Sequence, residues 1–218
     1  WGAVSHLNSV ADSPELRAAY NESLPAVTEF WTRLGADERL YAKYKQVNVN
    51  TLDTAQKQAL RNALRNFVLG GAELQGESKV RYAAIQERLA ELSQKFSENA
   101  LDATDKFSLY ATEEELEGVP EDVKTTAREA AEKEGQEGYK LTLKMPCYLP
   151  VMQFAKRSDL RQKLYKAYVT RASDQSDSAF AALDNSQNIQ EILQLRQEES
   201  KLLGYQNYAE VSVATKMA

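Results

Sequence analysis

Histidine and cysteine are nearly absent from this sequence. Its 218 residues include one of each, His6 and Cys147. Structural zinc sites use about four Cys or His ligands, and catalytic zinc sites use about three protein ligands. A catalytic Ser-His-Asp or Cys-His arrangement would have to be built on His6, near the first residue. The sequence therefore predicts no catalytic residue, no metal ligand and no cofactor-binding residue in this chain.

The sequence also lacks an excess of positive charge and a long apolar run. Lys and Arg together number 27 against 32 Asp and Glu, which gives a formal net charge of -5. Phosphate contacts need clustered Lys and Arg, so nucleic acid is not an expected partner. No stretch approaches the roughly 20 apolar residues of a membrane helix, and no signal-peptide pattern is present, so no membrane partner is expected. A single cysteine cannot form an internal disulfide, which allows a reducing compartment.

Both ends of the sequence look cut. It starts at Trp1 without an initiator Met, and its last residues, Lys216 to Ala218, include no Gly, Asn or Pro to finish a helix. We expect a fragment of a longer chain, although processing in the cell would give the same first residue.

The first half of the sequence is rich in apolar residues at helical spacing. Ser13 and Pro14 form a helix-start signal, and Pro25 should kink the helix that follows or split it in two. Apolar residues recur at intervals of three and four, with charged residues between them, in segments that cover residues 13–35, 37–44, 53–70 and 77–101. This pattern is typical of helices laid side by side in a bundle.

The pattern changes after Asp105. Residues 107–111 and 139–145 alternate between apolar and polar side chains, which predicts two short strands that pair with each other. Further helical segments are predicted at residues 119–134, 158–171 and 184–204, and a short helical or turn segment at residues 147–154. With 43% apolar and 27% charged residues, the chain can bury a real core in one sizeable domain or two small ones. The predicted fold class is mainly α, an antiparallel helical bundle with a small β-hairpin.

The two rare side chains have ordinary structural interpretations. His6 lies before the first strong helix signal, and the sequence places no partner beside it, so we interpret it as a packed or solvated side chain. Cys147 stands between Pro146 and Tyr148 with no basic residue or helix start clearly placed to activate its thiol. We interpret it as a small buried apolar residue.

Clusters of acidic and of aromatic residues are further candidates for a metal site or a peptide groove. Glu98, Asp102 and Asp105 lie near one face of the long helical segment, but a di-iron bundle would need two Glu-x-x-His motifs, and the chain has one histidine. We interpret these carboxylates, and the run 113–115, as solvated surface. Two interpretations stay open for six tyrosines, which either line a peptide groove or pack a core with the hydroxyl at its edge: Tyr139, Tyr148, Tyr165, Tyr168, Tyr205 and Tyr208.

Several stretches resemble the thimet oligopeptidase family (M3) of zinc metallopeptidases. The longest is LRQEESKLLGYQNYAE at 195–210, followed by ATKMA at 214–218. Supporting stretches are WGAVSHLN at 1–8, ELSQKFSEN at 91–99, YLPVM at 148–152 and YVTRAS at 168–173. They occur in the order found in the family and cover essentially the whole chain.

The resemblance implies a cytoplasmic enzyme that hydrolyses short peptides. Family members carry His-Glu-x-x-His, which places two zinc ligands on one helix face with a general base between them. This chain departs there, because His6 is followed by Leu7, Asn8 and Ser9. Zinc is therefore expected in the parent enzyme and not in this fragment, which should be inactive alone.

What matches is the N-terminal helical region of the family, so residues 1–218 are expected to form one domain that walls a substrate channel. Its expected partners are short peptide substrates and a missing C-terminal catalytic domain. The alternative is a free-standing helical module that binds peptides or proteins.

Overall fold

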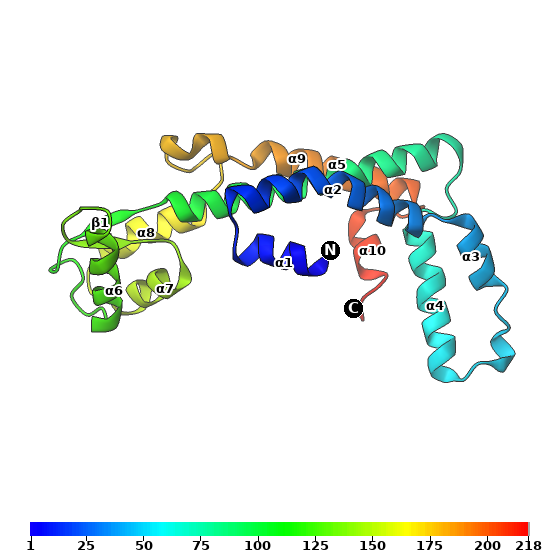
Figure 1. The fold of residues 1–218 in the computed structure, drawn as a ribbon, viewed down its shortest axis with the longest axis horizontal. Helices are drawn as coiled ribbons and strands as arrows, with labels where there is room; N and C mark the ends of the chain where they lie inside the picture. The colour runs from blue at the N-terminus through cyan, green and yellow to red at the C-terminus, as the bar shows by residue number, and fades with distance from the viewer. Residues whose placement is uncertain (218) are drawn as a thin grey trace. The chain divides into compact units, whose positions relative to one another are not determined.

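Capping side chains mark the starts of several helices. In the computed structural model, which describes residues 1–217, the Ser13 side chain accepts a hydrogen bond from the amide of Leu16 at 3.2 Å and begins α2 (Pro14–Gly35). Asp53 and Gln56 form a reciprocal capping box at the start of α4 (Thr54–Leu69). The chain is mainly helical, as predicted, and its helices are connected as Figure 1 shows.

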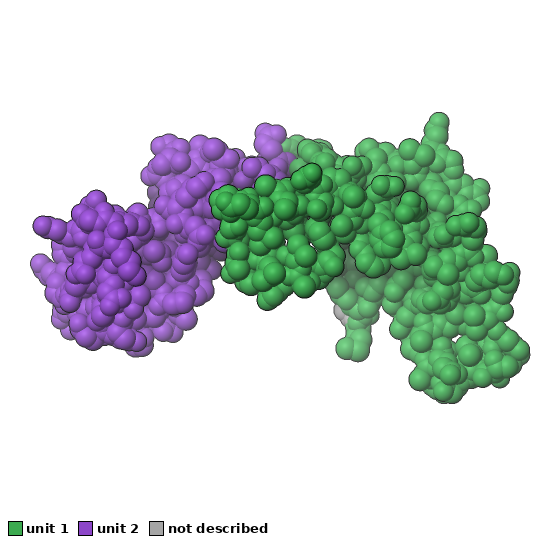
Figure 2. All heavy atoms as spheres, in the orientation of Figure 1, with its two compact units in different colours: residues 1–94, 190–218 green, residues 95–189 purple. Residues whose placement is uncertain are grey.

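The chain divides into two units. Unit 1 comprises residues 1–94 and 190–218, and unit 2 comprises residues 95–189 (Figure 2). Two long helices, α5 (Gly76–Lys106) and α9 (Ser186–Leu202), contribute residues to both units. The further helices of unit 1 are α1 (Gly2–Val10), α2, α3 (Glu38–Lys45), the short 3-10 helix Val49–Thr51, α4 and α10 (Tyr208–Val213).

Two features of the N-terminal part differ from the prediction. Pro25 lies inside α2, which is a single helix of 22 residues, so the predicted alternative of two helices is wrong. Proline removes one backbone hydrogen bond, and the remaining bonds of a long helix can hold it together across the missing one. The sequence analysis did not predict α1, because the apolar side chains of Val4, Leu7 and Val10 follow no capping signal and are exposed.

The core of unit 1 lies between α5 and α9. The buried residues Ile85 and Leu92 of α5 pack with Ile192 and Leu195 of α9. Ion pairs flank this seam, with Arg81 bound to Glu198 and Arg88 to Glu191, each at 2.6 Å. The seam thus combines a narrow apolar stripe with charged edges that remain in solvent.

Two glycines of unit 1 meet at a close backbone approach. A side chain at Gly70 would place its Cβ 2.8 Å from the carbonyl oxygen of Gly35. Gly70 also ends α4, as the sequence predicted. The approach requires a residue without Cβ at this position.

Unit 2 is built on a two-stranded hairpin. Strands β1 (Leu109–Ala111) and β2 (Tyr139–Leu141) are antiparallel, with Leu109 opposite Leu141. The other elements of unit 2 are α6 (Glu121–Glu132), α7 (Met145–Phe154), α8 (Ser158–Thr170) and the 3-10 helix Ser178–Leu183. The buried side chains of unit 2 form one cluster, to which the strands, the loop after β1 and the helices α6 to α8 contribute; it includes Leu116, Leu141, Val151, Leu160 and Leu164.

The predicted pairing of the strands is confirmed, but both strands are shorter than predicted. Residues 107–108 and 142–145 lie outside the ladder. The amide of Thr142 donates to the Sγ of Cys147 at 3.3 Å, and Pro146 lies in the first turn of α7. Because proline favours the first helical turn, the alternating pattern of residues 142–145 gives way to a helix start.

Gly138 allows the backbone before β2 to lie close to the end of β1. Its φ is +86°, and a Cβ there would lie 2.6 Å from the carbonyl oxygen of Ala111 on the neighbouring strand. Only glycine adopts this conformation without steric cost. Among residues 1–217, no helix has the length and apolar character needed to cross a membrane.

Candidate functional site

The structure gives the two rare side chains no shared site. His6 is exposed on α1 in unit 1, where its carbonyl oxygen accepts a hydrogen bond from Ser9 at 2.8 Å. Cys147 lies in unit 2, is half-buried and packs against the core of that unit. The thiol is therefore in the apolar environment that the sequence predicted, although it is only partly buried.

The acidic clusters are engaged in ion pairs. Asp102 binds Lys106 at 3.2 Å, and Asp105 binds Lys144 at 3.1 Å. Glu113 binds Lys124 at 2.6 Å, and this pairing lowers the pKa of the carboxyl group. Within residues 1–217, no group of three or more His, Cys, Asp or Glu side chains is arranged to hold a metal ion.

The six tyrosines divide between the two interpretations. Tyr139 and Tyr148 are buried in the core of unit 2, and Tyr148 stacks on Tyr168 with ring centroids 4.3 Å apart. Tyr165 is 55% exposed. Tyr208 lines a pocket in unit 1. Tyr139 and Tyr148 thus fit the core interpretation, while Tyr208 lines a pocket of unit 1 together with residues of α5 and α9.

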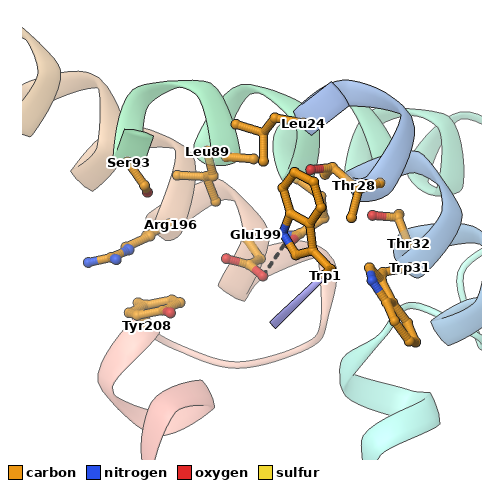
Figure 3. A pocket seen from close by; sticks show the side chains of 13 residues that line it. Trp1, Leu24, Thr28, Trp31, Thr32, Leu89, Ser93, Arg196, Glu199 and Tyr208 are labelled. Carbon is orange, nitrogen blue, oxygen red and sulfur yellow. Dashed lines mark hydrogen bonds between the residues drawn. The ribbon is translucent and has the colours of Figure 1, made fainter. Parts of the chain in front are cut away.

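This pocket has a volume of about 400 Å³. Helices α2, α5, α9 and α10 and residue Trp1 supply its lining. Figure 3 shows Leu24 and Leu89 along one side of the pocket and the rings of Trp1, Trp31 and Tyr208 among its other lining residues. The other lining residues are Val27, Thr28, Thr32, Gln86, Ala90, Ser93, Arg196 and Glu199.

A buried carboxylate is the main polar feature of the pocket. Glu199 is 8% exposed, and its Oε1 accepts a hydrogen bond from Nε2 of Gln86 at 2.8 Å. Burial raises the pKa of Glu199, while the hydrogen bond from Gln86 and the charge of Arg196 act in the opposite direction. Nearby, burial and then the charge of Glu199 raise the pKa of Tyr82, whose hydroxyl donates to the carbonyl of Leu69 at 2.9 Å.

Aromatic contacts hold the walls of the pocket. The guanidinium of Arg196 lies over the ring of Tyr208, 4.7 Å from its centroid. Trp1 stacks on Tyr20 with centroids 4.6 Å apart, and Trp31 packs edge-on against Phe30. The pocket therefore offers one carboxylate, one guanidinium and several ring faces to a small ligand.

Glu199 was not singled out from the sequence, where it appeared only within the stretch 195–210. Its position carries a signal, however. Glu199 follows Ile192 by seven residues and Leu195 by four, so it shares their face of α9. A charged residue on the buried stripe of an amphipathic helix is the sign that would have singled it out.

Comparison with known proteins assigns the chain to a family. The model of the Neurolysin/Thimet oligopeptidase N-terminal domain matches residues 1–79, and the model of Peptidase family M3 matches residues 151–218. Oligopeptidase A of Salmonella typhimurium is 49% identical over 223 aligned residues that include the whole chain. The chain belongs to peptidase family M3.

This M3 chain also aligns along its full length with further relatives. Oligopeptidase A of Escherichia coli is 49% identical, and the probable cytosolic oligopeptidase A of Arabidopsis thaliana is 41% identical. The family resemblance drawn from the sequence is thus confirmed. The chain spans about a third of the length of these relatives, 33% of the bacterial protein and 32% of the plant protein.

Proposed function

We propose that this chain is the N-terminal, non-catalytic part of a zinc-dependent oligopeptidase that hydrolyses short peptides. The observation that carries the proposal is the 49% identity to oligopeptidase A over the whole chain. Residues 1–217 offer no metal-binding cluster, and the sequence has no His-Glu-x-x-His motif. Zinc does not fit the residues of this chain, so any zinc of the whole enzyme would be held outside it.

In this proposal the chain walls a substrate channel and limits access to short, unfolded peptides in the cytoplasm. The partners are the peptide substrate and a C-terminal catalytic domain. Helices that present exposed apolar side chains, such as Phe30 and Trp31 on α2, support a role as a wall against further protein.

The reading frame that encodes this sequence tests the proposal. We expect it to continue past Ala218 into His-Glu-x-x-His, and its complete product to cleave internally quenched peptides of a few residues. The same cleavage sequence placed in a loop of a folded protein should stay intact, because the channel excludes it. The 218-residue chain alone should cleave neither substrate, with or without added zinc.

A free-standing peptide-binding module is the second candidate, and the pocket around Glu199 is the observation in its favour. A stop codon directly after Ala218, together with peptide binding by the chain, would establish this candidate and exclude the first.

A further inference from the structure

We propose that the pocket of unit 1 binds the N-terminal ammonium of a short apolar peptide, with Glu199 as its counter-ion. The carboxylate and the rings specify an organic ammonium; the choice of a peptide rests on the proposed function.

Within the described part of the chain, the carboxylate of Glu199 has one oxygen without a protein donor. The residue is 8% exposed, and among residues 1–217 Gln86 is its one hydrogen-bond donor, through Oε1. A carboxylate can accept several hydrogen bonds, and the second oxygen of Glu199 is not enclosed, so a ligand can reach it. Figure 3 shows the carboxylate directed into the space between the rings. A ligand that donates protons to the second oxygen would complete the site.

Aromatic and apolar side chains line the pocket beside the carboxylate. Trp1, Trp31 and Tyr208 line the pocket together with Glu199, and cations are attracted to ring faces within about 6 Å. One face of Tyr208 already carries the guanidinium of Arg196, and one face of Trp1 is stacked on Tyr20, so their opposite faces and the ring of Trp31 are left for a ligand. An ammonium supplies both the donors that Glu199 lacks and the charge that the rings favour. Leu24 and Leu89 line the same pocket and fit an apolar side chain next to the ammonium. The volume of about 400 Å³ lies within the roughly 300–1,000 Å³ of small-molecule pockets.

Arg196 determines which kind of ammonium the pocket accepts. Arg196 precedes Glu199 by one helical turn, so both side chains line one face of α9. Its guanidinium, held over Tyr208, repels a second cation and attracts carbonyl or carboxylate oxygens. This pair suits the start of a peptide chain, in which an ammonium is followed by carbonyl oxygens. It disfavours a peptide with a basic second residue.

Calorimetric titration of the 218-residue chain with the tripeptide Leu-Gly-Leu tests the inference. We expect measurable binding, and we expect N-acetylation of the tripeptide to weaken it at least tenfold. Glu199→Gln removes the charge but keeps the shape, and should also weaken binding at least tenfold. Trp31→Ala should weaken it severalfold; Trp31 is 57% exposed, so this variant should fold.

Glu198→Gln is the matched control. Glu198 neighbours Glu199 on α9 but binds Arg81 and does not line the pocket, so binding should change less than twofold. Circular dichroism of every variant verifies folding. Equal binding by Glu199→Gln and the unaltered chain would overturn the site. Equal binding of a peptide whose only ammonium is a lysine side chain would overturn the assignment to the peptide N-terminus.

Absence of tripeptide binding to the folded chain also overturns the inference, whatever the peptidase does. If the complete protein cleaves peptides and the chain binds none, only this inference fails. If the chain binds the tripeptide and the complete protein has no peptidase activity, the proposed function fails and the ammonium site stands.

Discussion

The two units of the chain bury apolar surface in different ways. Unit 2 has a broad cluster around its hairpin, in which Leu116, Leu141 and Leu164 have no exposed surface. Unit 1 has a narrow seam between α5 and α9, flanked by exposed ion pairs, and it leaves Phe30 and Trp31 in solvent. The pocket with the buried Glu199 also lies in unit 1.

Within residues 1–217, the buried cluster of unit 2 has twelve residues and that of unit 1 has four, so the two units differ in how much apolar surface one cluster buries. Apolar burial is the dominant favourable term in folding, so unit 2 has the larger internal source of stability. Unit 1 has exposed rings and the pocket on which the proposed ammonium site rests. Both tryptophans of the chain, Trp1 and Trp31, belong to unit 1, so tryptophan fluorescence reports on that unit alone.

The largest expected effect comes from a cavity in unit 2. Leu164→Ala removes a fully buried side chain of α8 and should lower the free energy of unfolding by about 2–5 kcal/mol. Urea denaturation followed by circular dichroism measures this loss, and tryptophan fluorescence tells whether unit 1 unfolds with unit 2. Leu193→Ala is the control, because Leu193 is 60% exposed and its loss should change stability little. Similar losses in both variants would mean that the unit 2 cluster is not the stabilising core.

The next effect concerns the backbone of the hairpin. Gly138→Ala forces a left-handed conformation that costs an L-residue about 1–2 kcal/mol, and its Cβ would also collide with the carbonyl of Ala111. We expect unit 2 to lose at least that much stability in urea denaturation. Gly2→Ala is the control, because Gly2 has open space around it and no positive φ. An unchanged denaturation midpoint for Gly138→Ala would show that the hairpin can relax around the new side chain.

Local signals made much of this architecture predictable from the sequence. Ser13 and Asp53 mark helix starts through side-chain bonds to backbone amides a few residues away, and the pairing of the two strands follows from their alternation. Such interactions are complete within a few residues, so the sequence contains all the groups involved. The boundary at residue 142 was missed because it depends on competition between the strand ladder and the start of α7.

The pocket could not be predicted from such local signals. It is assembled from helices far apart in the sequence, with Leu24 on α2, Leu89 on α5 and Tyr208 on α10. Periodicity tells which face of a helix is buried but not which other helix covers it. The sequence shows only that Glu199 shares a face of α9 with apolar residues. The hydrogen bond from Gln86 and the rings that line the same pocket are known only from the structure.

A pH series tests the cost of the buried carboxylate in unit 1. Burial raises the pKa of Glu199 in the folded chain, so the unfolded chain loses this proton at lower pH than the folded one. The protonated Glu199 therefore contributes to stability at any pH below its pKa in the unfolded chain. This contribution is lost as the pH rises through its pKa in the folded chain. Glu199→Gln should stabilise the chain at pH 7 but not near pH 4, measured as the difference between variant and unaltered chain in fluorescence-detected urea denaturation. A difference that does not change with pH would show that Glu199 titrates normally.

The smallest effect separates the seam of unit 1 from its charged edges. Arg88 binds Glu191 at 2.6 Å, but both side chains are 40% or more exposed. Water and salt screen such pairs, so Arg88→Ala should barely move the urea midpoint, and 0.5 M NaCl should not change that result. Leu92→Ala, one turn along α5 and 3% exposed, should cost about 2–5 kcal/mol. If the two variants lost equal stability, the ion pairs and not the apolar stripe would hold α5 to α9, and unit 1 would differ from unit 2 in the kind of interaction that stabilises it.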